Sequence, residues 1–405
     1  MPPVKINIYL LSILLFFSFT TPSYSVENEV LKLNAQYFTQ IGHPAQFQWA
    51  PQNYKYDIIY YIPQSLRGKK NVKALIFNHG GGRSTLTRAG SLDSVISYEN
   101  DLIKLANELD FVAILPSSSG LNWNGHTEGM MRELVKLLRK EINVDPNRIG
   151  LAGHSMGGMG ISRSYGWLAD QFAFFLTTSS GMNLSVLSDL EKEQALNKEF
   201  NVPYLHFQGW DDPVEGGLFV DLCHEQIKET QILEKKYQVK SKLKIDFYNA
   251  GHNYQYPVFK QHLRDAFQFS RNLYQPELWG SLRTSNSWIT ENGVAFQQIP
   301  VLRYFWVEAS SVIPSLDEKI DFHAQIKDQE IHIEINSREQ SKELAVLELR
   351  IYLSSKLIDL HQQIKVFING QLNTIKEPSQ AVLTSKNIDA SDQGFQFEDQ
   401  IDIRI

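Results

Sequence analysis

The chain has 405 residues, a formal net charge of −6, a hydrophobic fraction of 42 % and a charged fraction of 21 %. These values are those of a globular protein long enough for one large domain and a smaller one, each with a core of its own. The acidic balance and the lack of blocks of like charge argue against a polyanionic partner such as nucleic acid.

The first 25 residues have the pattern of a secretory signal peptide. Lys5 precedes an apolar run over residues 8–19, and Ser23 and Ser25 place small side chains at positions −3 and −1 of a cleavage site after Ser25. The apolar run is shorter than the roughly 20 residues of a spanning helix, which favours cleavage over an uncleaved anchor. We therefore expect a secreted or periplasmic protein without stable membrane insertion after cleavage.

Short apolar strands alternate with amphipathic helices between residues 54 and 274, with a turn at residues 145–147. The alternation predicts an α/β fold, with a mainly parallel sheet and helices on both faces, over a domain of residues 26–275. The expected strands are residues 56–63, 72–77, 111–116, 149–152, 172–177, 203–208 and 243–248. The expected helices are residues 95–109, 126–142, 218–237 and 259–274.

One cysteine, Cys223, is present in the whole sequence. An intramolecular disulfide is therefore impossible, and zinc sites of the cysteine–histidine type are excluded. Because Cys223 lies in the expected helix of residues 218–237, we expect a buried, small apolar residue rather than a nucleophile.

The pattern changes after residue 274 to period-two alternation without helical stretches, which is typical of half-exposed strands. The strongest hairpin signal there is Asn369-Gly370. We place a boundary near residue 276 and expect a smaller, β-sandwich-like module over residues 276–405. Its expected strands are residues 320–326, 330–335, 347–353, 364–368 and 395–405.

The clearest chemical signal is the stretch IGLAGHSMGG at residues 149–158. Ser155 lies in a G-x-S-x-G sequence directly after an apolar strand, and glycines two residues before and after it permit a turn tight enough to hold the hydroxyl clear of the backbone. The competing interpretation is that Ser155 is a helix N-cap. The rest of the chain decides between the two, because a serine nucleophile needs a base, an orienting carboxylate and an anion-stabilising site.

Candidates for the base and the acid follow predicted strands. The base is His252, with His206 and His126 as rivals, and the carboxylate is Asp212 or Asp211. Their order in the chain, serine, acid and histidine, is that of α/β-hydrolases. The carboxyl ends of parallel strands meet at one edge of a sheet, where ligands bind in such folds.

An oxyanion site needs two backbone N–H groups. We expect one from Met156, the residue after the nucleophile, and one from the glycine loop at residues 79–82, at Gly81 with Gly80 as rival. Trp123 and Trp210 also follow strand ends and are possible substrate-binding residues, with core or rim packing as the alternative for each.

Residues 54–274 resemble the α/β-hydrolase superfamily through the stretches FNHGGG, VDPNRIGLAGHSMGG, HFQGWDDPV and AGHNY. Within it they are similar to secreted polyhydroxybutyrate depolymerases, feruloyl esterases and LpqC-like esterases, and to related predicted peptidases of the dienelactone-hydrolase type. The resemblance places the acid on Asp212, before Pro213-Val214, and the base on His252. The chain departs from this group in two ways. It cannot form the disulfides that are frequent in secreted depolymerases and feruloyl esterases. Residues 276–405 are not an obvious polymer-binding domain and resemble instead the β-rich extension of some predicted peptidases and esterases.

We therefore expect an exported serine hydrolase that cleaves carboxylic esters through an acyl-enzyme, without a metal or an organic cofactor. The expected partner is an ester that is a small molecule, a polysaccharide-linked group or a polyester. Two alternatives stay open, a serine peptidase of the same fold and a non-catalytic binding protein.

Overall fold

The computed structural model describes residues 31–35, 56–81, 87–118, 123, 127–185, 187–283, 287–291, 294–298, 301–311, 319–337, 348–378, 386–389 and 392–405. Leu31–Ile405 form one compact unit. The predicted signal peptide and the rival base His126 lie outside the described residues. Among the described helices, none is both long enough and apolar enough to cross a membrane.

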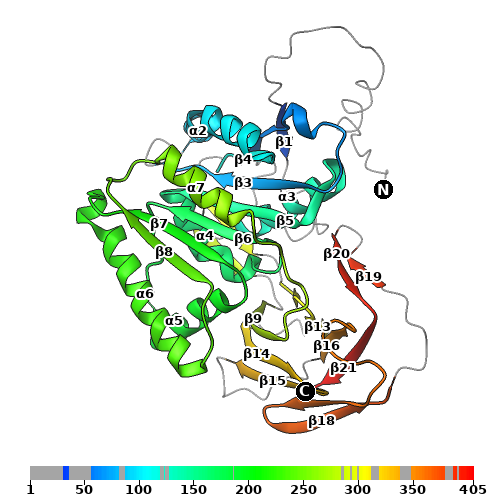
Figure 1. Ribbon diagram of the computed structural model, residues 1–405. Helices are drawn as coiled ribbons and strands as arrows, with labels where there is room; N and C mark the ends of the chain where they lie inside the picture. Colours follow the sequence, from blue (N-terminus) through cyan, green and yellow to red (C-terminus); the bar gives the residue numbers. More distant parts are fainter. Residues whose placement is uncertain are drawn as a thin grey trace, which may run out of the picture. The chain divides into compact units, whose positions relative to one another are not determined.

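An eight-stranded sheet organises the first part of this unit (Figure 1). Its strands stand in the order β1-β2-β4-β3-β5-β6-β7-β8. The first two pairings are antiparallel and all pairings from β4 to β8 are parallel. The carboxyl ends of β3 to β8 therefore meet at one edge. The strands are β1 (Leu31–Ala35), β2 (Tyr56–Tyr61), β3 (Val72–Asn78), β4 (Val112–Pro116), β5 (Val144–His154), β6 (Phe174–Thr178), β7 (Tyr204–Gly209) and β8 (Leu243–Tyr248).

Helices connect the parallel strands and cover both faces of the sheet. Right-handed crossovers place α2 on one face and α3, α4 and α6 on the other. The helix α7 follows the last strand of the sheet and packs against α2, so it lies on the α2 face, and α3 packs against α4 on the other. In Figure 1, α7 crosses the near face of the sheet. The helices are α2 (Arg88–Leu109), α3 (Thr127–Glu141), α4 (Met156–Leu168), α5 (Asp189–Leu196), α6 (Leu218–Tyr237) and α7 (Tyr256–Ala266), with short 3-10 turns η2 (Gln64–Leu66), η4 (Asn197–Phe200) and η5 (Val214–Gly216).

The central strands are apolar because both of their faces are covered. All of β4 and β6 and nearly all of β3 are buried, whereas the edge strand β8 is only partly buried. Uninterrupted apolar runs are what a parallel sheet between two helix layers requires. The predicted α/β-hydrolase fold is confirmed by this sheet and its two helix layers.

The described residues after residue 276 contain no helix and build two main sheets, in the orders β18-β17-β15-β14-β9 and β12-β13-β16-β21. Tyr304 of the second sheet contacts Phe322 of the first, so apolar side chains meet between the sheets as in a sandwich. The predicted β-sandwich-like module is present. Its strands are β9 (Glu277–Arg283), β12 (Arg303–Tyr304), β13 (Val307–Ser311), β14 (Lys319–Lys327), β15 (Glu330–Ser337), β16 (Glu348–Leu353), β17 (Ile364–Ile368), β18 (Gln371–Lys376) and β21 (Asp399–Arg404), with two ribbons, β10 (Ser287–Glu291) with β11 (Val294–Gln298) and β19 (Lys386–Asp389) with β20 (Asp392–Phe397).

Local details differ from the sequence interpretation. The helix expected over residues 95–109 begins at Arg88, and the strand expected over residues 395–405 is divided into β20 and β21. The predicted turn at residues 145–147 lies within the bounds of β5, where the register with β3 shifts between Val144 and Ile149 and the Asn147 N–H donates to Asp145 Oδ1 over 2.9 Å. The last helix ends at Ala266 instead of residue 274, because the chain then turns and the Arg271 N–H donates to the Asn147 carbonyl. The hairpin prediction at Asn369-Gly370 is confirmed, since both residues have positive φ and join β17 to β18.

Candidate active site

Ser155 alone forms the turn between β5 and α4. Its φ of 52° and ψ of −117° lie in a sparsely populated region for a residue with a side chain. The Ser155 N–H donates to the Thr178 carbonyl of β6 over 2.9 Å, which helps to hold this conformation. The hydroxyl makes no capping hydrogen bond to α4, so the N-cap interpretation does not describe where this side chain points.

The glycines around Ser155 are required by close backbone contacts. A Cβ atom at Gly153 would lie 2.7 Å from the Gly157 carbonyl carbon, and one at Gly157 would lie 2.1 Å from the Asn78 carbonyl oxygen. Atoms cannot approach so closely without a shift of the backbone. The first turn of α4 therefore lies directly against the end of β3, where the glycine loop begins.

Three predicted site residues come together at the edge of the sheet. His252, between β8 and α7, has its Nε2 2.8 Å from Ser155 Oγ and its Nδ1 2.9 Å from Asp212 Oδ2. An ionised carboxylate only accepts, so Nδ1 carries the proton and Nε2 accepts from the serine hydroxyl. The Asp212 carboxylate is buried, and the His252 side chain keeps 24 % of its surface exposed.

The rival acid and the described rival base lie elsewhere. Asp211 is exposed, whereas the buried Asp212 carboxylate also accepts from Gln208 Nε2 at 2.8 Å and from the Val214 N–H at 3.1 Å. His206 is buried between Thr177 and Gln208, and burial lowers its pKa to about 4. Neither Asp211 nor His206 forms a hydrogen bond or an ion pair with Ser155 or His252.

Two residues that the sequence interpretation missed support the His252 loop. The ring of His154 lies beside that of His252, with 5.3 Å between centroids, and His154 Nε2 is 3.0 Å from the His252 carbonyl oxygen. Burial lowers the pKa of His154 to about 4, so the ring is neutral and has one N–H. Because a carbonyl only accepts, Nε2 donates and Nδ1 accepts from the Tyr98 hydroxyl at 2.6 Å. His154 could have been found from its position within the G-x-S-x-G sequence, next to Ser155. No sequence pattern marks Tyr98.

The glycine loop is held by hydrogen bonds to its first two residues. Trp123 Nε1 donates to the His79 carbonyl over 2.8 Å, and Ser94 Oγ donates to the Gly80 carbonyl over 2.5 Å. His79 Nδ1 donates to the same Gly80 carbonyl, while its Nε2 accepts from the Ser118 N–H. Burial lowers the pKa of His79 to about 4. Trp123 is itself fully buried, so its indole supports the loop and offers no face to a ligand here.

The two residues predicted for the oxyanion site lie on adjoining segments. Met156 is the first residue of α4, and the glycine loop starts where α4 touches β3. The Gly80 backbone is engaged by a hydrogen bond with Tyr98, whose pKa burial raises to about 12. This favours Gly81, which is exposed, over its rival Gly80; Gly82 lies outside the described residues.

Trp210 is exposed on the surface, directly before Asp211. Half of its surface, 51 %, is accessible, and its ring stacks on Phe247 with a centroid distance of 4.1 Å. His224 stacks on the same phenylalanine. These rings form an aromatic patch at the β8 edge, which keeps Trp210 a candidate for ligand contact.

Cys223 is fully buried, and burial raises the pKa of its thiol. The thiol is therefore protonated at neutral pH, in keeping with a packing role. Within the part of the chain that the structure describes, no three His, Cys, Asp or Glu side chains gather as a metal site would require.

No protein-family model matches the chain, and no curated protein sequence does. Its structure is similar to that of a thermostable esterase, with a TM-score of 0.41, 16 % identity, and coverage of 60 % of this chain and 63 % of that one. A ferulic acid esterase has a TM-score of 0.41 and 16 % identity, covering 60 % of this chain and 99 % of that one. The fluorophosphonate-binding serine hydrolase F of Staphylococcus aureus has a TM-score of 0.40 and 15 % identity, covering 60 % and 98 %. These three solved structures are those of two esterases and a serine hydrolase.

Proposed function

We propose that this protein is a serine hydrolase that cleaves carboxylic esters through an acyl-enzyme. The observation that carries the proposal is the line of two hydrogen bonds from Asp212 through His252 to Ser155, 2.9 and 2.8 Å long. That line ends on a hydroxyl presented by a strained turn. A nucleophile, a base within reach and a third group that orients the base are the geometric requirements for this chemistry.

In the proposed reaction, Ser155 Oγ attacks the ester carbonyl carbon while His252 Nε2 takes the hydroxyl proton. The imidazolium is stabilised by Asp212, which accepts from Nδ1, and the backbone N–H groups of Met156 and Gly81 stabilise the oxyanion. His252 then gives the proton to the departing alcohol. A water molecule, activated by the same histidine, attacks the acyl-enzyme and releases the acid. None of these steps calls for a metal or an organic cofactor.

The decisive experiment is the substitution Ser155→Ala. We expect kcat on an activated ester such as a p-nitrophenyl acetate to fall on the order of 10⁶-fold, because the nucleophile and its proton are both lost. A fluorophosphonate probe should label the wild-type protein and leave the variant unlabelled. The control is Ser97→Ala, an exposed serine of α2, which should keep wild-type turnover. A Ser155→Ala protein with half the wild-type activity contradicts the proposal.

The substrate class is tested by matched leaving groups. We expect turnover of an ester, and little turnover of the corresponding anilide or peptide amide, since an amide demands protonation of a poorer leaving group. Equal turnover of the two would favour the peptidase alternative. A panel of acyl chain lengths, feruloyl esters and polyester film would then identify the acyl group.

We further propose that the protein is exported, with cleavage after Ser25, and that its mature chain comprises a catalytic domain to residue 275 and a β-module from residue 276. The basis is the sequence pattern of the first 25 residues. N-terminal sequencing of the protein recovered from the periplasm or medium should start at Val26. Recovery of a chain that starts at Met1 from the cytoplasm would refute the export proposal.

A further inference from the structure

Behind Asp212, three buried polar side chains form a continuous line on the α4 side of the sheet. Gln208 Nε2 lies 2.8 Å from Asp212 Oδ2, and Gln208 Oε1 lies 3.3 Å from His206 Nε2. The other ring nitrogen of His206, Nδ1, lies 2.7 Å from Thr177 Oγ1. Gln208 and Thr177 are completely buried and His206 is 3 % exposed. The catalytic steps proposed above use none of these three.

The directions of these hydrogen bonds follow from the chemistry of the groups. The amide nitrogen of Gln208 donates to Asp212 and, at 3.2 Å, to the Gly209 carbonyl, so Oε1 faces His206 and accepts from it. His206 is neutral, because burial lowers its pKa to about 4, and it therefore has one N–H. That proton lies on Nε2, because Oε1 only accepts. Nδ1 then accepts from the Thr177 hydroxyl at 2.7 Å, which is nearer than the Tyr204 hydroxyl, the other acceptor of Thr177, at 3.3 Å. Every donor in the line points toward Asp212.

This arrangement solves a problem that a buried triad carboxylate poses. Asp212 must stay ionised without water, so its oxygens need donors. A cation beside it would supply them but would also compete with the imidazolium for the negative charge. A neutral amide donates without that competition. The Gln208 amide could also be rotated by half a turn, which would place its oxygen against the Asp212 carboxylate. The His206 N–H prevents this rotation, because it can donate to the amide oxygen and not to the amide nitrogen.

We infer that Gln208 and His206 are positioning residues of the active site, which orient the Asp212 carboxylate through a neutral, one-directional hydrogen-bond line. The inference rests on the proposed function, because it assigns these residues to the triad acid. Gln208 acts on Asp212 directly, and His206 acts through Gln208. Thr177 selects the tautomer of His206.

The test is a double-mutant cycle between Gln208→Met and Asp212→Asn on an activated ester. Methionine keeps the length of the side chain and removes the donor. In the wild-type background we expect Gln208→Met to lower kcat about tenfold, the size of one hydrogen bond to a charged group, with KM changed less than twofold. In the Asp212→Asn background it should lower kcat less than twofold, because the group on which it acts is already changed.

A role in packing alone would give the same loss in both backgrounds, and that result overturns the inference. Wild-type kcat for Gln208→Met overturns it as well. If Gln208→Met does not fold, as judged by its thermal melt, His206→Phe replaces it in the same cycle. A threefold loss of kcat in the wild-type background that is absent in the Asp212→Asn background supports the inference. An equal loss in both backgrounds contradicts it. Failure of the proposed function is seen separately, as activity that survives Ser155→Ala.

Discussion

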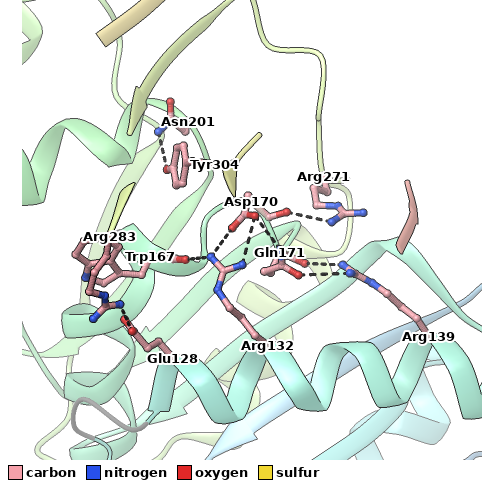
Figure 2. A network of polar contacts seen from close by, with 10 residues as sticks. All are labelled: Glu128, Arg132, Arg139, Trp167, Asp170, Gln171, Asn201, Arg271, Arg283 and Tyr304. Atoms are coloured by element: carbon pink, nitrogen blue, oxygen red, sulfur yellow. Dashed lines mark hydrogen bonds and ion pairs between the residues drawn. The ribbon is translucent and has the colours of Figure 1, made fainter. Parts of the chain in front are cut away.

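Two buried polar regions of this protein treat charge in opposite ways. In the candidate active site, the histidines around the triad are neutral because burial lowers their pKa, and Asp212 is surrounded by an amide, a backbone N–H and an imidazole. Where the β-module meets the α/β part, charged side chains meet in pairs. We call this second region the module interface; Figure 2 shows ten of its residues, Glu128, Arg132, Arg139, Trp167, Asp170, Gln171, Asn201, Arg271, Arg283 and Tyr304.

Among these ten residues, Asp170 is 1 % exposed and binds side chains from two other segments of the α/β part. Its carboxylate accepts from Arg132 at 3.0 Å, and its backbone carbonyl accepts from Arg271 Nη1, also at 3.0 Å. Arg132 also donates to the Trp167 carbonyl. These contacts join α3 and the segment that follows α7 to Asp170 and the end of α4 (Figure 2).

Contacts of Arg283 and of Asn201 join β9 and β12 to the α/β part. The Arg283 guanidinium of β9 pairs with the Glu128 carboxylate at the start of α3, and it lies over the Trp167 ring at 4.5 Å. Asn201 Nδ2 donates to the Tyr304 hydroxyl at 3.0 Å, and Asn201 Oδ1 accepts from the Trp279 N–H at 3.1 Å.

The difference teaches what each region is built to do. Removal of one partner of a buried ion pair strongly lowers the free energy of unfolding, because the other partner remains as a buried charge without its counterion. Such pairs suit a contact that does not change during function. In a proton-transfer site the base gains and loses a proton in every cycle. Neutral neighbours allow this change, because no neighbouring buried charge loses its partner when the base changes charge.

Substitution of the triad acid should separate activity from stability most widely. We expect Asp212→Asn to lower kcat about 10⁴-fold, because an amide holds the wrong tautomer of His252. The free energy of unfolding should change far less, since asparagine keeps most of the volume and one acceptor. The matched control is Asp211→Asn, at the exposed neighbouring acid, which should retain kcat within twofold. Similar losses for both variants contradict the choice of Asp212.

The opposite result is expected from Glu128→Ala in the module interface. Removal of this buried carboxylate leaves the Arg283 guanidinium without it, which should cost about 3–5 kcal/mol of unfolding free energy in a denaturant titration. The kcat of the folded protein should stay within twofold of wild type. The double variant Glu128→Ala/Arg283→Met should recover much of the loss, because the charge of Arg283 is removed together with that of Glu128. Equal destabilisation by the single and double variants would show that packing, and not charge, is what Glu128 provides.

A buried acid beside the module interface should make stability depend on pH. Burial raises the pKa of Glu199 in η4 to about 8, although Gln226 and Thr230 donate to its carboxylate. A raised pKa in the folded state means that its contribution is full below pH 4.5, the ordinary value of a glutamate, and is lost as the pH rises through 8. The wild-type free energy of unfolding should therefore decline between about pH 5 and 8, by about 1.4 kcal/mol for each unit of pKa shift.

Glu199→Gln should flatten this decline, since an amide does not ionise and still accepts one hydrogen bond. The measurement is a series of denaturant titrations from pH 5 to 8 for both proteins. Identical slopes in the two series would mean that Glu199 is ionised in the folded protein.

Sequence patterns predicted the proposed catalytic residues better than the residues that contact them. Ser155, Asp212 and His252 each follow a strand within a recognisable local motif, so the parallel sheet alone brings them to one edge. Tyr98 reaches His154 across 56 positions of sequence, and Arg283 reaches Glu128 across 155. No local period marks such partners, because only the tertiary fold makes them neighbours.

The same reason explains the errors in the fold. The central strands and α6 follow from hydrophobic period, since burial on both faces decides their composition. The early end of α7 does not, because a distant contact of Arg271 with Asn147 competes with a helical pattern that continues in the sequence. Short strands of the module such as β12, two residues long, carry no period to detect.

The smallest effect is expected from Tyr98→Phe, which removes one hydroxyl from the active-site region. The phenol donates to His154 Nδ1 at 2.6 Å, and His154 in turn donates to the backbone carbonyl of His252. Without the phenol, the neutral His154 ring loses the donor that selects its tautomer, and the His252 loop loses a constraint. We expect kcat on an activated ester to fall about three- to tenfold, with unchanged KM, and a stability loss of about 1 kcal/mol.

The matched control for Tyr98→Phe is Tyr256→Phe, which removes a hydroxyl that bonds Glu108 on the surface and should leave kcat unchanged. A lower stability with wild-type kcat for Tyr98→Phe would assign the Tyr98–His154 pair to packing alone. In that case His154 would contribute to stability and not to activity, as the residues of the module interface do. The contrast between the two regions would then rest on Asp212 and its neighbours only.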